Sequence, residues 1–410
     1  MVEETQSEDS ASTKTGALDG VTVLEFSALI AGPSCARFMA DHGARVIKIE
    51  RFPNGDVSRN SFSTLHPGRG PLYTQHNAGK LGMCVDLKQA QGLALVKDLV
   101  RQADVVVEAF TPGVMQRLGL GYEDLKALNP RIILCSISGF GQTGPNAQRP
   151  GYAHVSHAMS GWLALQFLHR DPPEAPRGPG VAIADTTTGI TAFGAVCAAL
   201  FKRERTGRGD HIDISLFDAL FCSNDSTYQA TLQSDGDVDV WYHPVHATRD
   251  GYVTANVGPD YRAWENVCKA MGREELLQDP RFDSQAHVMD NVHEAGALVS
   301  AWLATLTSAQ AEQVLSEHHI PCAPVLSVDA AVRQPQVIER GLTVDVVDPV
   351  LGEIKTLNSA YRYTDSNADV RGPAPCLGEH NGEVLRDLLN LDEAGIEQLY
   401  ADGVLRRGDR

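Results

Sequence analysis

The stretch Gly20-Val-Thr-Val-Leu-Glu-Phe-Ser-Ala-Leu-Ile-Ala-Gly-Pro33 decides the fold of this chain. Its first part, 20–26, is a short apolar and β-branched run, which predicts a buried strand. Pro33 suits the first turn of a helix, because the missing proline N–H has no helical partner to lose there. We expect this helix to end at Gly43 and a second strand to follow over 45–50. Together these elements form one βαβ unit.

Strand and helix continue to alternate along the N-terminal half. Runs that are apolar throughout and joined by helices are typical of a parallel sheet covered on both faces, so the predicted fold class is α/β. The further expected elements are strands over 104–110 and 131–137, and helices over 87–102, 122–128, 187–204 and 216–232.

The chain changes character between about 240 and 330. Short β-like runs flank Asp250-Gly251, and this dipeptide is typical of a hairpin turn. Several short helices follow, so we expect a smaller inserted α+β domain with linkers on either side. The large α/β domain is expected to comprise 18–225 and 335–410, and residues 1–17 to form a disordered tail.

Charge and composition disfavour several kinds of partner. The 410 residues carry a formal net charge of −17, which repels phosphate backbones and anionic lipid, so no nucleic acid and no membrane are expected as partners. No stretch approaches the roughly 20 apolar residues that span a bilayer, and the polar N-terminus does not resemble a signal peptide. We therefore expect a cytoplasmic location. The scattered cysteines and histidines show no ligand spacing, so no metal site is expected.

The turn 27–33 is the first candidate ligand site. It follows a strand of the predicted sheet, at the edge where such sheets bind ligands, and a helix N-terminus there offers N–H groups to phosphate. Glu50 ends the next strand, where dinucleotide-binding folds often place a ribose-binding acid. The GxGxxG motif is absent, so NAD is disfavoured, and an ordinary strand–helix turn is the alternative.

Asp185 is the second candidate, in Val181-Ala-Ile-Ala-Asp-Thr-Thr-Thr-Gly189. It precedes a long apolar helix, and aspartate is a favoured N-cap. An N-cap position would also direct a carboxylate toward a ligand-binding edge. The loop 138–145 contains three glycines, which permit close backbone approach, although a flexible loop is an equal alternative. The segment 203–210 is interpreted as a basic helix C-terminus with a glycine stop.

Taken in order, these segments resemble the family III coenzyme A transferases, a group that includes formyl-CoA:oxalate and carnitine CoA transferases and, as a relative, α-methylacyl-CoA racemase. The matching segments are LDGVTVLEFSALIAGPSCARFMADHGARVIKIER (18–51), NAGKLGMCVDLK (77–88), ADVVVEAFTPGVMQRLGLGYEDLKALNPRII (103–133), SGFGQTGP (138–145), ADTTTG (184–189), RTGRGDHIDISLFDAL (205–220), HIPCAPV (319–325) and LGEH (377–380).

The resemblance implies a fold and a mechanism. Family members have a Rossmann-like, CoA-binding large domain built from both chain ends, with a small domain inserted, and two chains interlock as a homodimer. Asp185 takes the place of the catalytic aspartate, which forms mixed-anhydride and aspartyl-CoA thioester intermediates. Backbone N–H groups of the glycine loop would stabilise each oxyanion. Coenzyme A and acyl-CoA enter as substrates, and no permanently bound cofactor is implied.

The resemblance also carries CoA contacts over by position. Ala28, Leu29 and Ala31 are expected against the nucleotide and pantetheine, and Arg51 at the adenine or phosphates. Further contact positions are Val85, Leu87, Phe110, Thr111, Arg117 and Tyr152.

Two alternatives remain open. A racemase needs a base on each face of the α-carbon, and Tyr152 stands where racemase relatives carry histidine, which favours a transferase. A non-catalytic subunit of a heteromeric transferase is the other alternative, and the presence of Asp185 disfavours it. Arg177, Arg249 and Arg262 are candidates for binding the second carboxylate of a dicarboxylic acid, although surface arginines are usually solvated.

Overall fold

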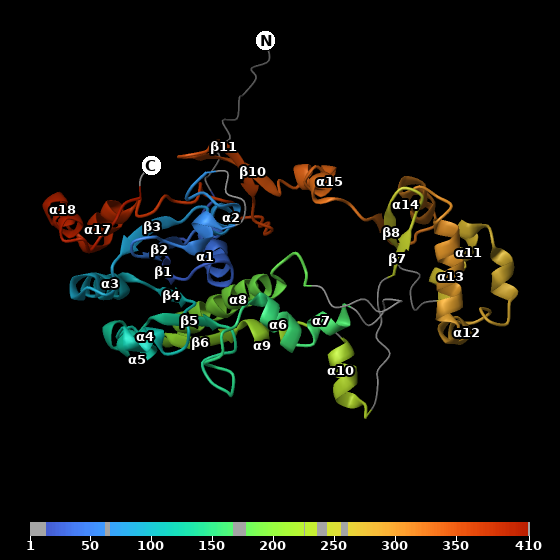
Figure 1. The fold of residues 1–410 in the computed structure, drawn as a ribbon, viewed down its shortest axis with the longest axis horizontal. Coiled ribbons are helices and arrows are strands. Elements are labelled where there is room, and N and C mark those ends of the chain that lie inside the picture. Colours follow the sequence, from blue (N-terminus) through green and yellow to red (C-terminus); the bar gives the residue numbers. More distant parts are fainter. Residues whose placement is uncertain are drawn as a thin grey trace, which may run out of the picture. The chain divides into compact units, whose positions relative to one another are not determined.

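The chain divides into two compact units. In the computed structural model the described residues are 14–61, 66–166, 178–224, 226–235, 244–255 and 261–408. The first unit comprises 1–226 and 339–410, and the second comprises 227–338 (Figure 1). The first unit is therefore built from both ends of the chain.

A six-stranded parallel sheet forms the centre of the first unit. Its strands are β1 (Thr22–Phe26), β2 (Arg45–Arg51), β3 (Leu81–Val85), β4 (Val105–Glu108), β5 (Ile133–Ser138) and β6 (Asp210–Ser215). They lie in the order β3-β2-β1-β4-β5-β6, and each neighbouring pair is parallel. This order is that of the dinucleotide-binding α/β fold and reverses between β1 and β4 (Figure 1). The predicted α/β class is confirmed.

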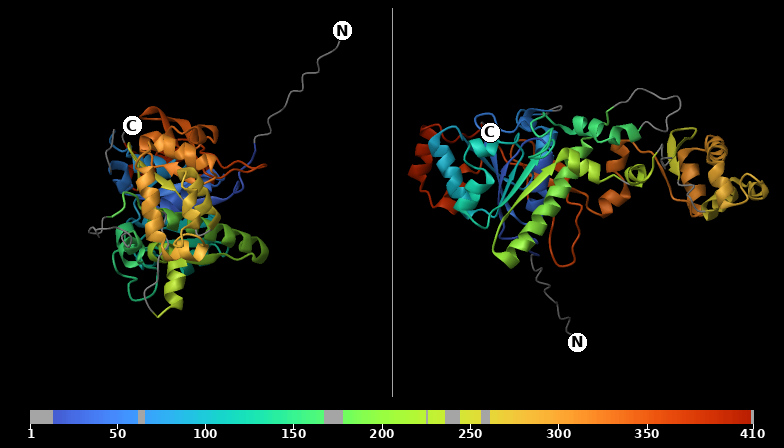
Figure 2. Two further views of the ribbon diagram at one scale, coloured as in Figure 1. Left: turned by 90° about the vertical axis from the view of Figure 1, so that its right-hand side faces the viewer. Right: turned by 90° about the horizontal axis from the view of Figure 1, so that it is seen from below.

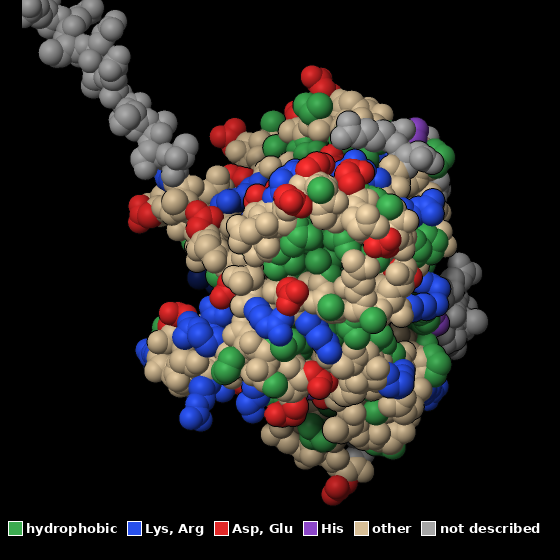
Figure 3. Space-filling view, turned by 90° about the vertical axis from the view of Figure 1, so that its left-hand side faces the viewer, with side chains coloured by type: hydrophobic (Ala, Val, Ile, Leu, Met, Phe, Trp, Pro, Cys, Tyr) green, Lys and Arg blue, Asp and Glu red, His purple; other side chains and the backbone are tan. Residues whose placement is uncertain are grey.

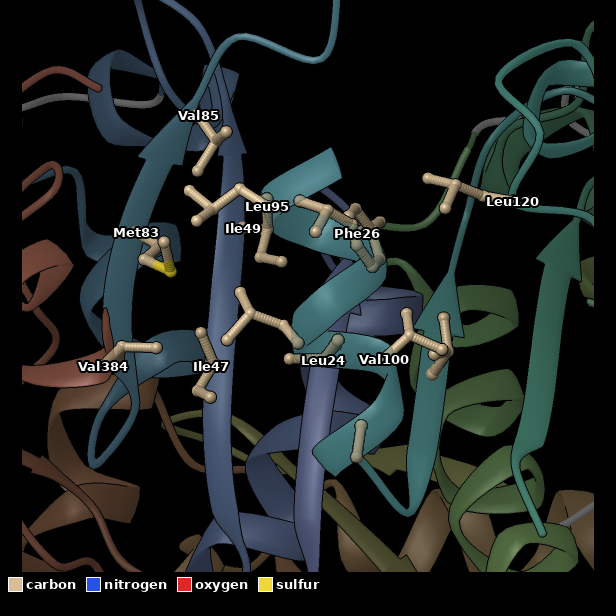
Figure 4. Close-up of a cluster of buried hydrophobic side chains, with 14 of the residues drawn as sticks. Leu24, Phe26, Ile47, Ile49, Met83, Val85, Leu95, Val100, Leu120 and Val384 are labelled. Atoms are coloured by element: carbon tan, nitrogen blue, oxygen red, sulfur yellow. The ribbon is translucent and has the colours of Figure 1, made fainter. Parts of the chain in front are cut away.

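One face of the sheet is covered partly by the C-terminal end of the chain. Leu24, Ile47 and Met83 point toward α3 (Ala90–Gln102) and α17 (Asn381–Leu389), which contributes Val384 (Figure 4). The α5 (Tyr122–Leu128) and α18 (Glu393–Ala401) helices extend this core.

Residues near the C-terminus also accept hydrogen bonds from the outer edge of β3. The backbone N–H of Gly82 donates to His380 Nδ1 at 3.1 Å, and that of Cys84 donates to Asn381 Oδ1 at 3.0 Å. These two backbone donors of the edge strand are therefore satisfied by a segment almost 300 residues later in the chain.

Helices α1 (Ala31–Asp41), α8 (Ile183–Thr206) and α9 (Leu216–Cys222) cover the other face. The long α8 packs beside α1, β5 and β6 (Figure 2). Gly189 permits this approach, because a Cβ there would lie 2.6 Å from the Ser34 Cβ. By length and composition α8 would also suffice to cross a membrane, a test that core helices of soluble proteins pass. Val196 and Leu200 are buried in the core, so we assign α8 to it.

Two predicted helices differ from those observed. α8 begins four residues before the expected start, so Ala182 is the N-cap and Asp185 is not. Burial of Ala184 against the core favours the earlier start. The helix expected over 216–232 is interrupted between α9 and α10 (Ser226–Gln233). Asn224 donates a side-chain hydrogen bond to the Leu220 carbonyl at 2.8 Å, a contact that competes with helical bonding.

The remaining elements of the first unit are short. They are a 3₁₀ turn (Val57–Asn60), α2 (Pro71–Asn77), α4 (Val114–Arg117), α6 (Ala153–Met159), α7 (Trp162–Leu165), and the antiparallel pair β10 (Thr343–Asp348) and β11 (Gly352–Leu357). On the side where α3, α17 and α18 lie in Figure 1, basic and acidic side chains alternate with hydrophobic ones (Figure 3). That face therefore presents no continuous basic surface.

The second unit packs helices on a three-stranded antiparallel sheet. Its strands are β7 (Val245–Ala247), β8 (Tyr252–Ala255) and β9 (Cys322–Pro324), and its helices include α11 (Tyr261–Met271), α12 (Gln285–Asp290), α13 (Val292–Leu303), α14 (Ser308–Glu317) and α15 (Val328–Val332). α16 (Pro335–Glu339) ends at the unit boundary. Trp264 and Phe282 anchor the core. The predicted hairpin is confirmed, since Asp250-Gly251 lies in the turn between β7 and β8.

Candidate active site

A cavity of about 240 Å³ lies at the carboxyl ends of β1, β4 and β5. The strand order reverses between β1 and β4, and open α/β sheets bind ligands at such a point. Predicted site residues that line the cavity are Ala28, Leu29, Ala31, Phe110, Thr111, Tyr152 and Asp185. The structure thus brings most of the expected contact positions together beside the expected nucleophile.

The other expected CoA contacts do not line this cavity. Arg51 and Val85 are register partners at the ends of β2 and β3. Arg51 is exposed, but the Val85 side chain is only 1% exposed within the core, where Leu87 packs nearby. Arg117 is exposed in the last turn of α4. Arg51 therefore remains accessible to a ligand, whereas the Val85 side chain does not.

Asp185 is a half-buried carboxylate without a protein partner. It is the third residue of α8, and among the described residues no hydrogen bond or ion pair engages its side chain. Burial raises the pKa of Asp185 to about 6. The helix N-terminus favours a negative charge at this position. At neutral pH, Asp185 is therefore mostly an ionised, poorly solvated carboxylate facing a cavity.

A buried histidine supports the first turn of α8. The Ala184 N–H donates to His157 Nε2 at 3.1 Å, so this nitrogen carries no proton. Burial lowers the pKa of His157, which keeps the ring neutral. The imidazole thereby satisfies a backbone donor that has no helical acceptor at a helix N-terminus.

The turn after β1 adopts a strained conformation. Leu29 has a φ of 68°, which is rare for a residue with a branched side chain. Its N–H donates to Asp56 Oδ1 at 3.3 Å, and Asp56 Oδ2 lies 3.0 Å from Lys48 Nζ. A buried ion pair between Asp56 and Lys48 thus holds the turn at Leu29, which forms part of the cavity wall.

That ion pair belongs to a buried cluster of four charges beneath the turn. Lys48 Nζ lies 2.9 Å and Lys80 Nζ 2.7 Å from the Glu25 carboxylate, and all three side chains are inaccessible to solvent. Burial by itself would raise the pKa of Glu25. The positive charges of Lys48 and Lys80 outweigh this effect, so the pKa of Glu25 lies below its ordinary value. Burial lowers the pKa of Lys80 to about 8. With Asp56 the cluster is formally neutral.

The Glu50 carboxylate, which was considered for ribose binding from its place at the end of a strand, is buried and engaged by protein groups. Its carboxylate accepts from Arg59 Nε at 2.8 Å and from the Asp56 N–H at 2.9 Å. It is only 3% exposed. The sequence prediction used only the position of Glu50 at the end of a strand. In the structure Arg59, nine residues later, forms an ion pair with this carboxylate.

The glycine-rich loop after β5 closes on itself. A Cβ on Gly139 or on Gly151 would lie 2.6 Å from the Cα of the other, so only glycine permits the crossing. The Gly141 N–H donates to Ser138 Oγ at 2.9 Å, and the Gln142 N–H donates to the Asp213 carboxylate at 3.0 Å. These two N–H groups are therefore engaged within the protein.

A model of CoA-transferase family III matches residues 18–381. The chain is a family III CoA-transferase. It moves coenzyme A between acyl donors and carboxylic acids, with CoA thioesters as substrates.

Similar proteins support this assignment, because their sequences align with most of the transferase chain. It is 32% identical to succinyl-CoA:glutarate CoA-transferase of Mus musculus, covering 95% of this chain and 90% of that one. It is 33% identical to succinyl-CoA–D-citramalate CoA-transferase of Chloroflexus aurantiacus, covering 95% and 98%. A crystal structure of a point mutant of Rv3272 from Mycobacterium tuberculosis matches with a TM-score of 0.80 and 30% identity, covering 90% of this chain and 99% of that one.

The cation in the transferase cavity was not predicted from the sequence. Of the arginines considered for a second carboxylate, Arg177 lies outside the described residues, and Arg249 and Arg262 belong to the second unit. Arg149 instead lines the cavity. Its place between the glycine-rich loop 138–145 and Gly151 was the available signal.

Proposed function

We propose that Asp185 is the covalent nucleophile of the transfer. Its carboxylate attacks the thioester carbonyl of the donor, the C–S bond breaks, and a mixed anhydride and the CoA thiolate form. The thiolate then attacks the aspartyl carbonyl, which releases the donor acid and leaves an aspartyl-CoA thioester. The acceptor carboxylate repeats the two steps in reverse order, so that CoA leaves on the new acid and Asp185 is regenerated.

The unpartnered carboxylate at the cavity is the observation that carries this proposal. A carboxylate with few hydrogen bonds in a poorly solvated site is a stronger nucleophile than one in water, because less solvation is lost on attack. The turn that holds Leu29 would lie along the pantetheine arm, and the exposed Arg51 would reach the phosphates.

A trapping experiment tests the nucleophile. The protein is incubated with a panel of acyl-CoA donors and hydroxylamine, and modified peptides are mapped by mass spectrometry. We expect a hydroxamate at Asp185 and none in Asp185→Asn. Transfer without any modification of Asp185 would contradict the proposal, and donor-dependent exchange of an α-hydrogen with solvent deuterium would indicate a racemase instead.

Activity should depend on the ionisation of Asp185. Because only the carboxylate attacks, and its pKa is raised by burial to about 6, kcat/KM for the donor should fall about tenfold per pH unit below that value. The measurement is a pH–rate profile between pH 4.5 and 8, with folding checked at each pH. A flat profile down to pH 5 would contradict the expectation.

We also propose that the transferase acts as a homodimer. The family resemblance implies an interlocked dimer, and several hydrophobic side chains of the first unit that are exposed in the single chain would be available for burial in it. They include Ile190 and Phe201 on α8 and Val347 and Leu357 on β10 and β11. Native mass spectrometry should give twice the chain mass, and a monomer at micromolar concentration would refute the dimer.

A further inference from the structure

Arg149 is the cation of the cavity. Among the described residues that line it, Asp185 and Arg149 carry charge, and the others are apolar or neutral. A guanidinium is weakly hydrated and presents a planar fork that matches a carboxylate. An anionic group is therefore the ligand that this side of the cavity recognises.

The loop fixes Arg149 at the wall. The crossing of Gly139 and Gly151 closes the loop, and the Arg149 N–H donates to the Asn146 carbonyl at 2.8 Å. The Arg149 guanidinium lies 5.8 Å from the centre of the Phe140 ring. Arg149 is exposed, and no carboxylate in the described part of the chain forms an ion pair with it, so the guanidinium is accessible to a ligand.

Arg149 and Asp185 do not neutralise each other. A nearby cation would lower the pKa of a carboxyl group, whereas the pKa of Asp185 is raised, with burial as its cause. The nucleophile and the cation therefore face the cavity from separate positions. A ligand that bridges them must have a reactive carbonyl at one end and an anion at the other.

The volume of the cavity indicates which part of the substrate is bridged. At about 240 Å³ it is smaller than the roughly 300–1,000 Å³ of sites for drug-sized ligands. It suits an acyl group and the end of the pantetheine arm, while the CoA phosphates lie a whole pantetheine arm away from the thioester. An anionic group that binds Arg149 while the thioester meets Asp185 would therefore belong to the acyl group.

We propose that Arg149 binds the distal carboxylate of a dicarboxylic acyl group whose thioester end meets Asp185. The transferase would then select short dicarboxylic acids over monocarboxylic acids of equal chain length. This inference rests on the proposed role of Asp185.

The test compares succinyl-CoA with butyryl-CoA, two donors of equal chain length that differ in the distal carboxylate. The initial rate of CoA thiol release in the first turnover, with hydroxylamine as the trap, is followed for the full chain at low donor concentration. After subtraction of the rate without enzyme, this rate gives an apparent kcat/KM for each donor. We expect the wild-type protein to prefer succinyl-CoA. In Arg149→Gln the ratio of the two kcat/KM values should fall roughly 10- to 100-fold, as expected when a charged hydrogen bond is lost, and Arg149→Lys should keep part of the preference.

Arg131→Gln is the matched control. Arg131 is an exposed arginine paired with Glu204 and does not line the cavity, so its removal should leave the ratio unchanged. Equal slowing of both donors in Arg149→Gln, an unchanged ratio, or a wild-type preference for butyryl-CoA would overturn the inference while leaving Asp185 as nucleophile. Loading of Asp185 by neither donor, nor by any other of the trapping panel, would overturn the proposed function as well.

Discussion

Asp185→Asn will abolish CoA transfer and at the same time make the protein more stable at neutral pH. Loss of a covalent nucleophile should cost at least about 10³-fold in kcat. The folded protein holds the carboxyl pKa at about 6, above the ordinary value, so the ionised group opposes folding. An amide removes that charge, and we expect a gain of about 1–2 kcal/mol, allowing for partial solvation.

The pH dependence of the stability gain distinguishes the removal of a buried charge from a general change in packing. A group whose folded pKa is raised costs nothing at low pH, and its penalty develops as pH rises through the folded value. The unfolding midpoint of Asp185→Asn should therefore exceed that of the wild type clearly at pH 7.5 and less at pH 4.5. The matched control is Asp218→Asn, which alters an exposed acid in the first turn of α9 and should show neither change. Full transfer activity in Asp185→Asn would refute the assigned role.

Glu25→Gln is expected to destabilise the fold by about 3–5 kcal/mol, because it leaves buried charge without compensation. The substitution keeps the side-chain shape but removes the carboxylate that pairs with Lys80, whereas Lys48 keeps Asp56 at 3.0 Å. Lys80, whose pKa is already lowered by burial to about 8, will then lose its proton more readily. Since the neutral amine carries no buried charge, the loss of stability should be larger at pH 6 than at pH 9.

Urea unfolding at these two pH values measures the effect. Glu123→Gln is the control, because Glu123 pairs with Lys126 at the surface at 3.6 Å, and such pairs contribute within about 1 kcal/mol. A cost below about 1 kcal/mol for Glu25→Gln would show that the cluster is solvated or rearranges easily.

The sequence predicted the helices and strands that are determined by residues adjacent in the chain. The β1–α1–β2 unit and α5 appear where apolar runs and helix breakers placed them. β3 was not predicted, since Gly82 lies within a run of only five residues, and glycine weakens the strand signal. The start of α8 was wrong because the preference of aspartate for N-caps is weaker than the burial of Ala184.

The contacts that hold the cavity residues in place could not be predicted, because they join segments that are far apart in the sequence. Leu29 looks like an ordinary turn residue until Asp56 is seen to accept its N–H. Glu50 looked available because its partner, Arg59, belongs to a different element. Arg149 required the crossing of two glycines to reach the cavity. The family resemblance supplied Asp185 and most of the cavity wall without any of these contacts.

The bonding of the β3 edge by residues near the C-terminus has a consequence for synthesis on the ribosome. Gly82 meets His380, which is 298 positions later in the chain, and translation at about 5–20 residues per second leaves this edge open for roughly 15–60 s. During that time an unpaired strand and the apolar face that α17 will cover are exposed to other nascent chains. The emerging polypeptide therefore exposes an aggregation-prone edge until its last helices leave the exit tunnel.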